Sequence, residues 1–453
     1  MASSTENRGF TSNIGAIAAA AGSAIGLGNI WRFPYTVGQN GGGAFLLLYI
    51  AFVFLIGVPI MMSEFVIGRR SQRNTVGAFA ALGAPYRKWT FVGVLGIVAA
   101  FLIYSFYSTV AGWTLNYVYL SGTGALSGKS PDQVSQVFST FTSSTMAPIV
   151  CQFIFLILTA AIIVMGVQKG IEKYTKILMP VLFVLMLLLC VRSLTLKGAG
   201  EGMNFLFRPD FSKLTAAGVL SALGQALFSL SIGMGALITY GSYIRKEDDL
   251  FKTSVCVASA DTAIALLSGI AIFPAVFAFG LSPASGPSLV YEVLPNVFNS
   301  MPMGTLFAVL FFLLLSIAAL TSTISLLEIV VLWVVEELHW SRKAATIGVS
   351  VLIFALGAVC TLSFGLLSDV HIFGCTVFDF LDKLTATYMM PIGALCITLF
   401  LGWRYPKADV CDELTNQGRL KAGYFRFFYF SLRYLAPIAL IIVLIMGIIG
   451  AEL

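Results

Sequence analysis

The chain has 453 residues, of which 58% are hydrophobic and 11% are charged, and its formal net charge is +6. Soluble domains carry about 25% charged residues, so this composition excludes a water-soluble globular protein. The seven cysteines form no CxxC pair, only two histidines are present, and the glycine run at 41–43 lacks the Lys-Ser/Thr of a phosphate loop. We therefore expect neither an enzyme nor a zinc site.

Eleven apolar segments approach the roughly 20 residues that a membrane-spanning helix needs. They lie at 14–36, 43–68, 89–120, 148–166, 174–193, 217–241, 253–280, 304–336, 344–364, 376–402 and 427–449. The chain is therefore predicted to be an all-α polytopic membrane protein with about 11 transmembrane helices. Lysine and arginine concentrate in alternate connections, at 69–88, 169–176, 245–252, 342–343 and 404–426. The positive-inside rule makes these connections cytoplasmic, with the N-terminus inside and the C-terminus outside the plasma membrane. We expect no nucleic acid partner for these charges.

The first and sixth segments carry the same glycine pattern in their middle. The first contains Ile25-Gly26-Leu27-Gly28 and the sixth contains Ile232-Gly233-Met234-Gly235. Each glycine costs about 1 kcal/mol relative to alanine inside a helix, so two together indicate a break. Close packing of small residues between helices is the alternative for either run alone.

The spacing of the two breaks predicts an inverted repeat. An offset of five segments is odd, so the two broken helices cross the membrane in opposite directions, which is the pattern of a transporter with its site at the midplane. Unwound backbone there offers N–H groups to an anion and carbonyl oxygens to a cation. The predicted organisation is a cytoplasmic segment at 1–13, repeats at 14–193 and 194–402, and a cytoplasmic loop with an eleventh helix at 403–453.

Motifs along the whole chain resemble those of the neurotransmitter:sodium symporters. The most specific are NIWRFPY at 29–35 and NGGGAF at 40–45, followed by GVP at 57–59, KGIEK at 169–173 and TYGSY at 239–243. The size resembles that of the prokaryotic eleven-span branch. The resemblance implies a LeuT-type 5+5 inverted-repeat fold with broken helices 1 and 6. It also implies sodium-coupled uptake of neutral, hydrophobic L-amino acids by alternating access.

The resemblance implies two co-transported sodium ions. The first site would consist of the Ala24 carbonyl, Asn29, Ser229, Asp261 and the substrate carboxylate. The second would consist of the carbonyls of Gly22, Ile25 and Ala318 and the hydroxyls of Thr321 and Ser322. Such oxygen-only ligand sets suit a hard cation. Without the resemblance, the two hydroxyls would be expected to bond to carbonyls of their own helix.

The implied substrate site surrounds the first break. The substrate carboxylate would meet the N–H groups of Leu27 and Gly28 and the Tyr107 hydroxyl. The amine would meet the carbonyls of Ala24, Phe228 and Ser229, with Ser231 nearby. The side-chain pocket would be lined by Ile103, Phe228, Met234, Ser322 and Leu326. Gly26 stands where monoamine carriers have an aspartate, which favours amino acids over monoamines.

The resemblance also implies gates on both sides of the site. The outer gate would be Tyr107 over Phe228, with Arg32 facing Asp382. The inner end would involve Arg8, Ser242, Tyr243 and Glu336. Gly170 and Pro180 would mark a stretch that unwinds to open a water path inward, although alone they are typical of a helix start and a proline kink.

Three carboxylates, Glu64, Asp261 and Glu328, lie within apolar segments, where an ionised group costs roughly 2.5–3.5 kcal/mol or more. Chloride-dependent relatives have asparagine in place of Asp261 and serine in place of Ala265. The Asp261 carboxylate would replace chloride as the compensating charge, with Tyr49, Gln225 and Ser229 as hydrogen-bond partners, so we expect no chloride requirement. Buried without sodium, the carboxylate would return protonated, which implies proton counter-transport. Glu64 and Glu328 could equally make structural contacts between helices.

A substrate-gated channel or a non-transporting amino acid sensor is the alternative on the same scaffold. A channel needs a continuous lined pore, whereas the polar groups here gather at two helix breaks. A sensor would usually add a soluble domain. The expected partners are the amino acid and the lipid bilayer, and the sequence carries no signal for an oligomeric state.

Overall fold

The computed structural model describes residues 9–84, 87–280, 290–299 and 301–449. Within them, nine helices are long and apolar enough to cross a membrane. A tenth crossing is a bent pair, Asn13–Ala24 and Gly28–Gln39, with 48° between its halves. The apolar helix Ala216–Ser229 and the short helix Ala236–Gly241 occupy the predicted sixth segment.

The membrane-spanning segments contain the following elements: α1 (Asn13–Ala24), η1 (Gly28–Arg32) and α2 (Phe33–Gln39); α3 (Gly43–Phe52), η2 (Val53–Gly57) and α4 (Val58–Ser71); η3 (Arg87–Trp89) and α6 (Thr90–Gly122); α8 (Met146–Val164); η4 (Val167–Glu172) and α9 (Lys173–Leu194); α11 (Ala216–Ser229) and α12 (Ala236–Gly241); α13 (Leu250–Ala278); α15 (Gly304–Glu337); α16 (Arg342–Leu362); α17 (Val377–Lys383), η7 (Leu384–Met389), α18 (Met390–Leu399) and η8 (Phe400–Arg404); α20 (Phe425–Phe430), η9 (Ser431–Leu435) and α21 (Ala436–Ile449).

The connections contain α5 (Thr75–Leu82), α7 (Pro131–Ser143), α10 (Ala199–Phe207), η5 (Phe211–Lys213), α14 (Val293–Asn299) and α19 (Lys407–Leu414). They also contain an antiparallel pair, β1 (His371–Ile372) and β2 (Cys375–Thr376), in which His371 faces Thr376.

The helices agree with the predicted segments to within a few residues, with one difference. The fifth crossing was expected from residue 174, but it begins at Val167. Gly166, with a φ of +85°, ends the preceding connection, and the π-helical turn η4 then carries Lys169 and Glu172 into the crossing. Because this turn contains charged residues, the hydropathy of the sequence did not assign it to the membrane-spanning segment.

Both predicted breaks are present, and they differ in conformation. Helix α1 ends at Ala24, and Ile25 is extended, with φ −78° and ψ 102°. Between α11 and α12, Ser231, Gly233 and Gly235 all have positive φ, at +55°, +86° and +80°. Glycine adopts this region at little cost, which explains the two glycines in the second break.

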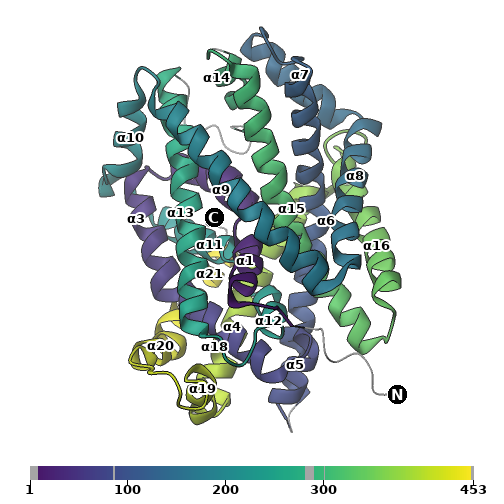
Figure 1. Ribbon diagram of the computed structural model, residues 1–453. Helices are drawn as coiled ribbons and strands as arrows, with labels where there is room; N and C mark the ends of the chain where they lie inside the picture. Colours follow the sequence, from purple (N-terminus) through teal and green to yellow (C-terminus); the bar gives the residue numbers. More distant parts are fainter. Residues whose placement is uncertain (1–8, 85–86, 281–289, 300, 450–453) are drawn as a thin grey trace.

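The two broken helices lie at the centre of the molecule (Figure 1). Helix α1 packs against α9, α12, α13 and α15, and the long helices α6 and α15 pack against each other. All the residues from Ala19 to Ile30 are buried. The broken backbone is therefore buried within the protein, a setting in which non-helical backbone is tolerated at membrane depth.

Candidate functional site

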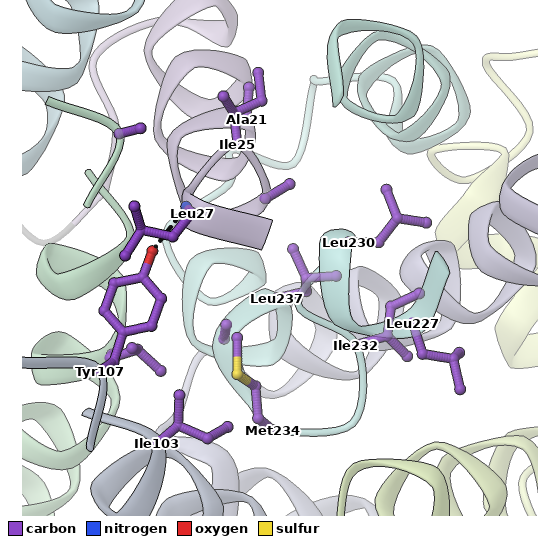
Figure 2. Packing of buried hydrophobic residues seen from close by; sticks show 14 of the residues in the cluster. Ala21, Ile25, Leu27, Ile103, Tyr107, Leu227, Leu230, Ile232, Met234 and Leu237 are labelled. Atoms are coloured by element: carbon purple, nitrogen blue, oxygen red, sulfur yellow. Dashed lines mark hydrogen bonds between the residues drawn. The ribbon is translucent and has the colours of Figure 1, made fainter. Parts of the chain in front are cut away.

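The unwound backbone of the first break is partly capped by side chains. The Leu27 N–H donates to the Tyr107 hydroxyl oxygen over 2.9 Å, and the Gly26 N–H donates to Asn29 Oδ1 over 3.1 Å. Figure 2 shows the Tyr107 ring, on α6, reaching the Leu27 backbone across the gap between helices. The structure thus brings together two of the three predicted carboxylate anchors.

A small cavity of about 30 Å³ lies between the two breaks. Its walls come from α1, the first break, η1, α6, α11, the second break, α15 and α18: Ser23, Ala24, Gly26, Gly28, Ile103, Tyr107, Phe228, Ser231, Met234, Ser322, Leu326 and Met390. Every predicted substrate residue except Leu27 and Ser229 lines it. Ser23 and Met390 were not predicted. Ser23 adjoins the first break, and nothing in the sequence brings Met390 to this site.

Gly26 has little room for a side chain beside the cavity. A Cβ added there would overlap Ser322 Oγ and would lie 2.9 Å from the Tyr107 hydroxyl oxygen. An aspartate at this position would therefore displace both neighbours. The packing around Gly26 therefore agrees with a site that has no acidic side chain here to pair with an amine lacking its own carboxylate.

Three of the predicted ligands of the first sodium ion form one buried cluster. Asn29 Nδ2 lies 2.7 Å from Asp261 Oδ1 and 3.0 Å from Ser229 Oγ. The Ser229 hydroxyl lies 2.9 Å from both carboxylate oxygens, and Tyr49 donates to Asp261 Oδ2 over 3.0 Å. Gln225, the other expected partner, instead donates to the Gly28 carbonyl over 2.9 Å.

The charge of this cluster is uncompensated within the described chain. Asp261 is 0% exposed, and no lysine or arginine among residues 9–84, 87–280, 290–299 and 301–449 forms an ion pair with it. A buried carboxylate that has only neutral donors is costly unless a cation joins it. Its oxygens, with that of Ser229, are the donor type that a hard cation prefers.

Some of the ligands predicted for the second sodium ion lie near the Thr321 hydroxyl. Thr321 Oγ1 lies 3.3 Å from the Ile25 carbonyl oxygen and 3.0 Å from that of Ala318. The second of these is the bond to its own helix that the alternative interpretation expected. The Ser322 hydroxyl lies 3.5 Å from the Ser23 carbonyl oxygen. Gly22 faces the Thr321 side chain, with 3.4 Å between a Cβ placed on Gly22 and that of Thr321.

The predicted outer gate residues lie beside the cavity. The Arg32 guanidinium carbon lies 4.5 Å from the Phe228 ring centroid, and Arg32 Nη1 lies 3.8 Å from Asp382 Oδ1. Tyr107 and Phe228 both line the cavity. A larger vestibule of about 340 Å³ begins at Arg32 and extends between α2, α11, η7 and α21.

At the predicted inner end of the site, Tyr243 contacts Glu328, which was not expected from the sequence. The Tyr243 hydroxyl donates to Glu328 Oε1 over 2.6 Å, and Glu328 forms a buried ion pair with Arg342. Glu336 accepts from the Asn74 N–H over 2.7 Å. Ser242 bonds back to the Thr239 carbonyl, and Arg8 lies outside the described residues. Glu328 thus makes a contact between helices, which was one of the two roles considered for it from the sequence.

Two further carboxylates join the broken helices to neighbouring segments. Glu64 Oε1 accepts from the Gly233 N–H over 2.8 Å, so α4 holds the second break. Glu172 accepts from the Thr11 N–H over 2.8 Å, which joins η4 to the start of α1. Gly170 belongs to η4, and Pro180 lies inside α9.

Comparisons with known proteins agree on one family. The model of the sodium:neurotransmitter symporter family matches residues 8–140 and 133–452. The sodium-dependent transporter YhdH of Bacillus subtilis is 42% identical over 434 residues, which cover 96% of each chain. A sodium-dependent transporter of Haemophilus influenzae is 35% identical over 446 residues, with 96% of this chain and 97% of the relative covered. The crystal structure of MhsT in complex with L-phenylalanine matches with a TM-score of 0.91 and 46% identity, covering 97% of this chain and 100% of the other.

Proposed function

The chain belongs to the sodium:neurotransmitter symporter family, and from this premise we propose that it takes up neutral, hydrophobic L-amino acids across the plasma membrane by alternating access. The observation that carries the proposal is the position of the Asn29–Ser229–Asp261 cluster beside a small apolar cavity. A sodium ion at the cluster and an amino acid in the cavity would share the first break. Binding of each would then favour binding of the other.

The chemistry of the cavity supports the substrate class. Its side-chain end is formed by Ile103, Met234 and Leu326, whereas Tyr107 and the N–H groups of Leu27 and Gly28 suit a carboxylate. An acidic partner to an isolated amine at Gly26 would have to displace the Ser322 and Tyr107 side chains. The related MhsT binds L-phenylalanine, a substrate of the proposed class.

Two sodium ions would be co-transported. The first would bind Asn29, Ser229, Asp261, the Ala24 carbonyl and the substrate carboxylate. The second would bind Thr321 and Ser322 with the carbonyls of Gly22, Ile25 and Ala318. Because Asp261 supplies a negative charge beside the first ion, transport would need no chloride.

Asp261 would also govern the return step. After sodium leaves inward, the carboxylate would be buried without a cation, and binding a proton would remove that cost. The protein would then carry a proton outward in each cycle. Unwinding between Gly170 and Pro180 would admit water to the second sodium site. This cycle assumes the cytoplasmic N-terminus and extracellular C-terminus that the charge pattern predicts.

Uptake by the purified full chain in proteoliposomes tests the function. An inward sodium gradient should drive labelled phenylalanine above its outside concentration, and potassium in place of sodium should abolish this. Uptake that only equilibrates would favour a channel. Sodium-dependent binding without any uptake would favour a sensor.

Two ion substitutions test the coupling. Gluconate in place of chloride should leave uptake unchanged, and a large loss would contradict the role given to Asp261. Acidifying the vesicle interior at constant sodium gradient should accelerate uptake, because it supplies the proton for the return step. Equal rates at acidic and neutral interior pH would exclude proton counter-transport as the limiting return step.

A further inference from the structure

The cavity at the two breaks is too small for a hydrophobic side chain unless its wall moves. Its volume of about 30 Å³ leaves room for no more than a few water molecules. Any substrate of the proposed class therefore displaces side chains of the wall. Which side chains yield decides how large a substrate is accepted.

Besides the aromatic rings of Tyr107 and Phe228, the wall contains two kinds of large aliphatic side chain. Ile103 and Leu326 are branched, whereas Met234 and Met390 are unbranched thioethers. Methionine has three rotatable bonds and fills irregular gaps, so it adapts at lower cost than a branched residue. Met234 lies in the second break between two glycines, but Met390 comes from a separate crossing, as the first residue of α18.

Met390 is held at the cavity by close backbone packing. Gly233 and Gly393 touch through their backbones: a Cβ on Gly393 would overlap the Gly233 carbonyl oxygen, and a Cβ on Gly233 would overlap the Met390 carbonyl oxygen. The first turn of α18 is therefore pressed against the second break. Met390 is 2% exposed and lines the cavity. The cavity is therefore the space into which its side chain can move.

The backbone before Met390 is distorted. The π-helical turn η7 ends at Met389, and the gate residue Asp382 lies just before that turn, on α17. Single π-helical turns within longer helices are frequent at functional sites. One crossing thus carries a gate residue and a wall residue of the cavity.

We propose that Met390 is a specificity-determining residue that sets the upper size of the substrate side chain. Its side chain fills the cavity behind a small substrate and rotates away from a large one. This assignment rests on the proposed function and adds a fourth crossing to a side-chain pocket predicted from three. It differs from the role of Met234, which lies within the unwound backbone itself.

Matched methionine variants of the full chain test the proposal. Met390→Ala should shift the ratio of tryptophan to valine affinities about tenfold or more in favour of tryptophan, since one methylene in an apolar pocket discriminates by roughly 10–200-fold. Met390→Leu keeps the volume but stiffens the side chain, so it should retain valine and weaken tryptophan. Met389→Ala, at the adjacent buried position outside the cavity wall, should leave the ratio unchanged.

The readout is sodium-dependent competition against labelled leucine in proteoliposomes, with the sodium half-saturation concentration measured in parallel. Equal changes for valine and tryptophan in Met390→Ala would overturn the proposal, as would the same shift in Met389→Ala. If Met390→Ala does not fold, an unchanged ratio in Met390→Leu has the same consequence. An unmodified protein that binds no amino acid with sodium would instead refute the proposed function itself.

Discussion

Replacing Asp261 by asparagine removes one charge from the buried cluster and preserves its shape. In the structure the carboxylate accepts hydrogen bonds from Asn29, Ser229 and Tyr49. An amide can keep part of these contacts but cannot neutralise a cation. The variant should therefore fold normally and lose sodium affinity selectively.

The magnitude follows from burial. Removing one partner of a fully buried ion pair costs about 3–5 kcal/mol, and each 1.4 kcal/mol is a factor of ten in affinity. The first sodium ion should thus bind Asp261→Asn roughly a hundred- to several-thousand-fold more weakly. Without sodium the effect reverses, because a lone ionised carboxylate at membrane depth costs about 2.5–3.5 kcal/mol. The sodium-free variant should therefore be at least as stable as the unmodified protein.

Two measurements on purified protein in detergent check the predicted loss of sodium affinity and the predicted stability of the sodium-free variant. Sodium at a hundred times its Kd should stabilise the unmodified protein by about 2.7 kcal/mol through mass action. Thermal unfolding should show this as a sodium-dependent rise in melting temperature. Asp261→Asn should lose most of this rise, whereas Asp210→Asn, at an exposed aspartate, should keep it. A sodium titration of amino acid binding should show the same loss. A sodium half-saturation concentration for Asp261→Asn within threefold of the unmodified value would refute the role of Asp261 as a sodium ligand.

Three further predictions follow from the geometry of the site. Replacing both Thr321 and Ser322 by alanine should reduce sodium-dependent uptake at least about tenfold in a protein that remains monodisperse; unchanged sodium dependence would exclude the second site. Tryptamine should not compete where tryptophan does, because a site built for a carboxylate leaves donors unpaired without one; equal competition would contradict the carboxylate-anchored pose. Gly393→Ala should abolish uptake by pushing against Gly233, whereas Gly224→Ala, whose Cβ would meet nothing within 4 Å, should preserve uptake and stabilise its helix by about 1 kcal/mol; equal uptake by both variants would show that the backbone contact is dispensable.

Much of this protein follows from local sequence. Apolar segments of membrane length specify helices because backbone groups in hydrocarbon can only be satisfied within the helix. Paired glycines at 26 and 28 and at 233 and 235 locate both breaks, because glycine is a poor helix former. Residues near these breaks form much of the cavity wall, because the site surrounds the interrupted backbone. Tyr107 and Ser322, on other helices, were implied only by the family resemblance.

Other features were decided only by how the crossings pack. Met390 reaches the cavity because Gly393 lets α18 approach Gly233, a contact between residues 160 positions apart that no local pattern encodes. Tyr243, which follows α12, contacts Glu328 on α15, and Arg342 at the start of α16 pairs with the same carboxylate. Such contacts depend on the relative rotation and depth of whole helices, which are set by the sum of many small packing terms. Periodicity and composition specify which residues form a helix, and only the assembled bundle decides which of its side chains meet.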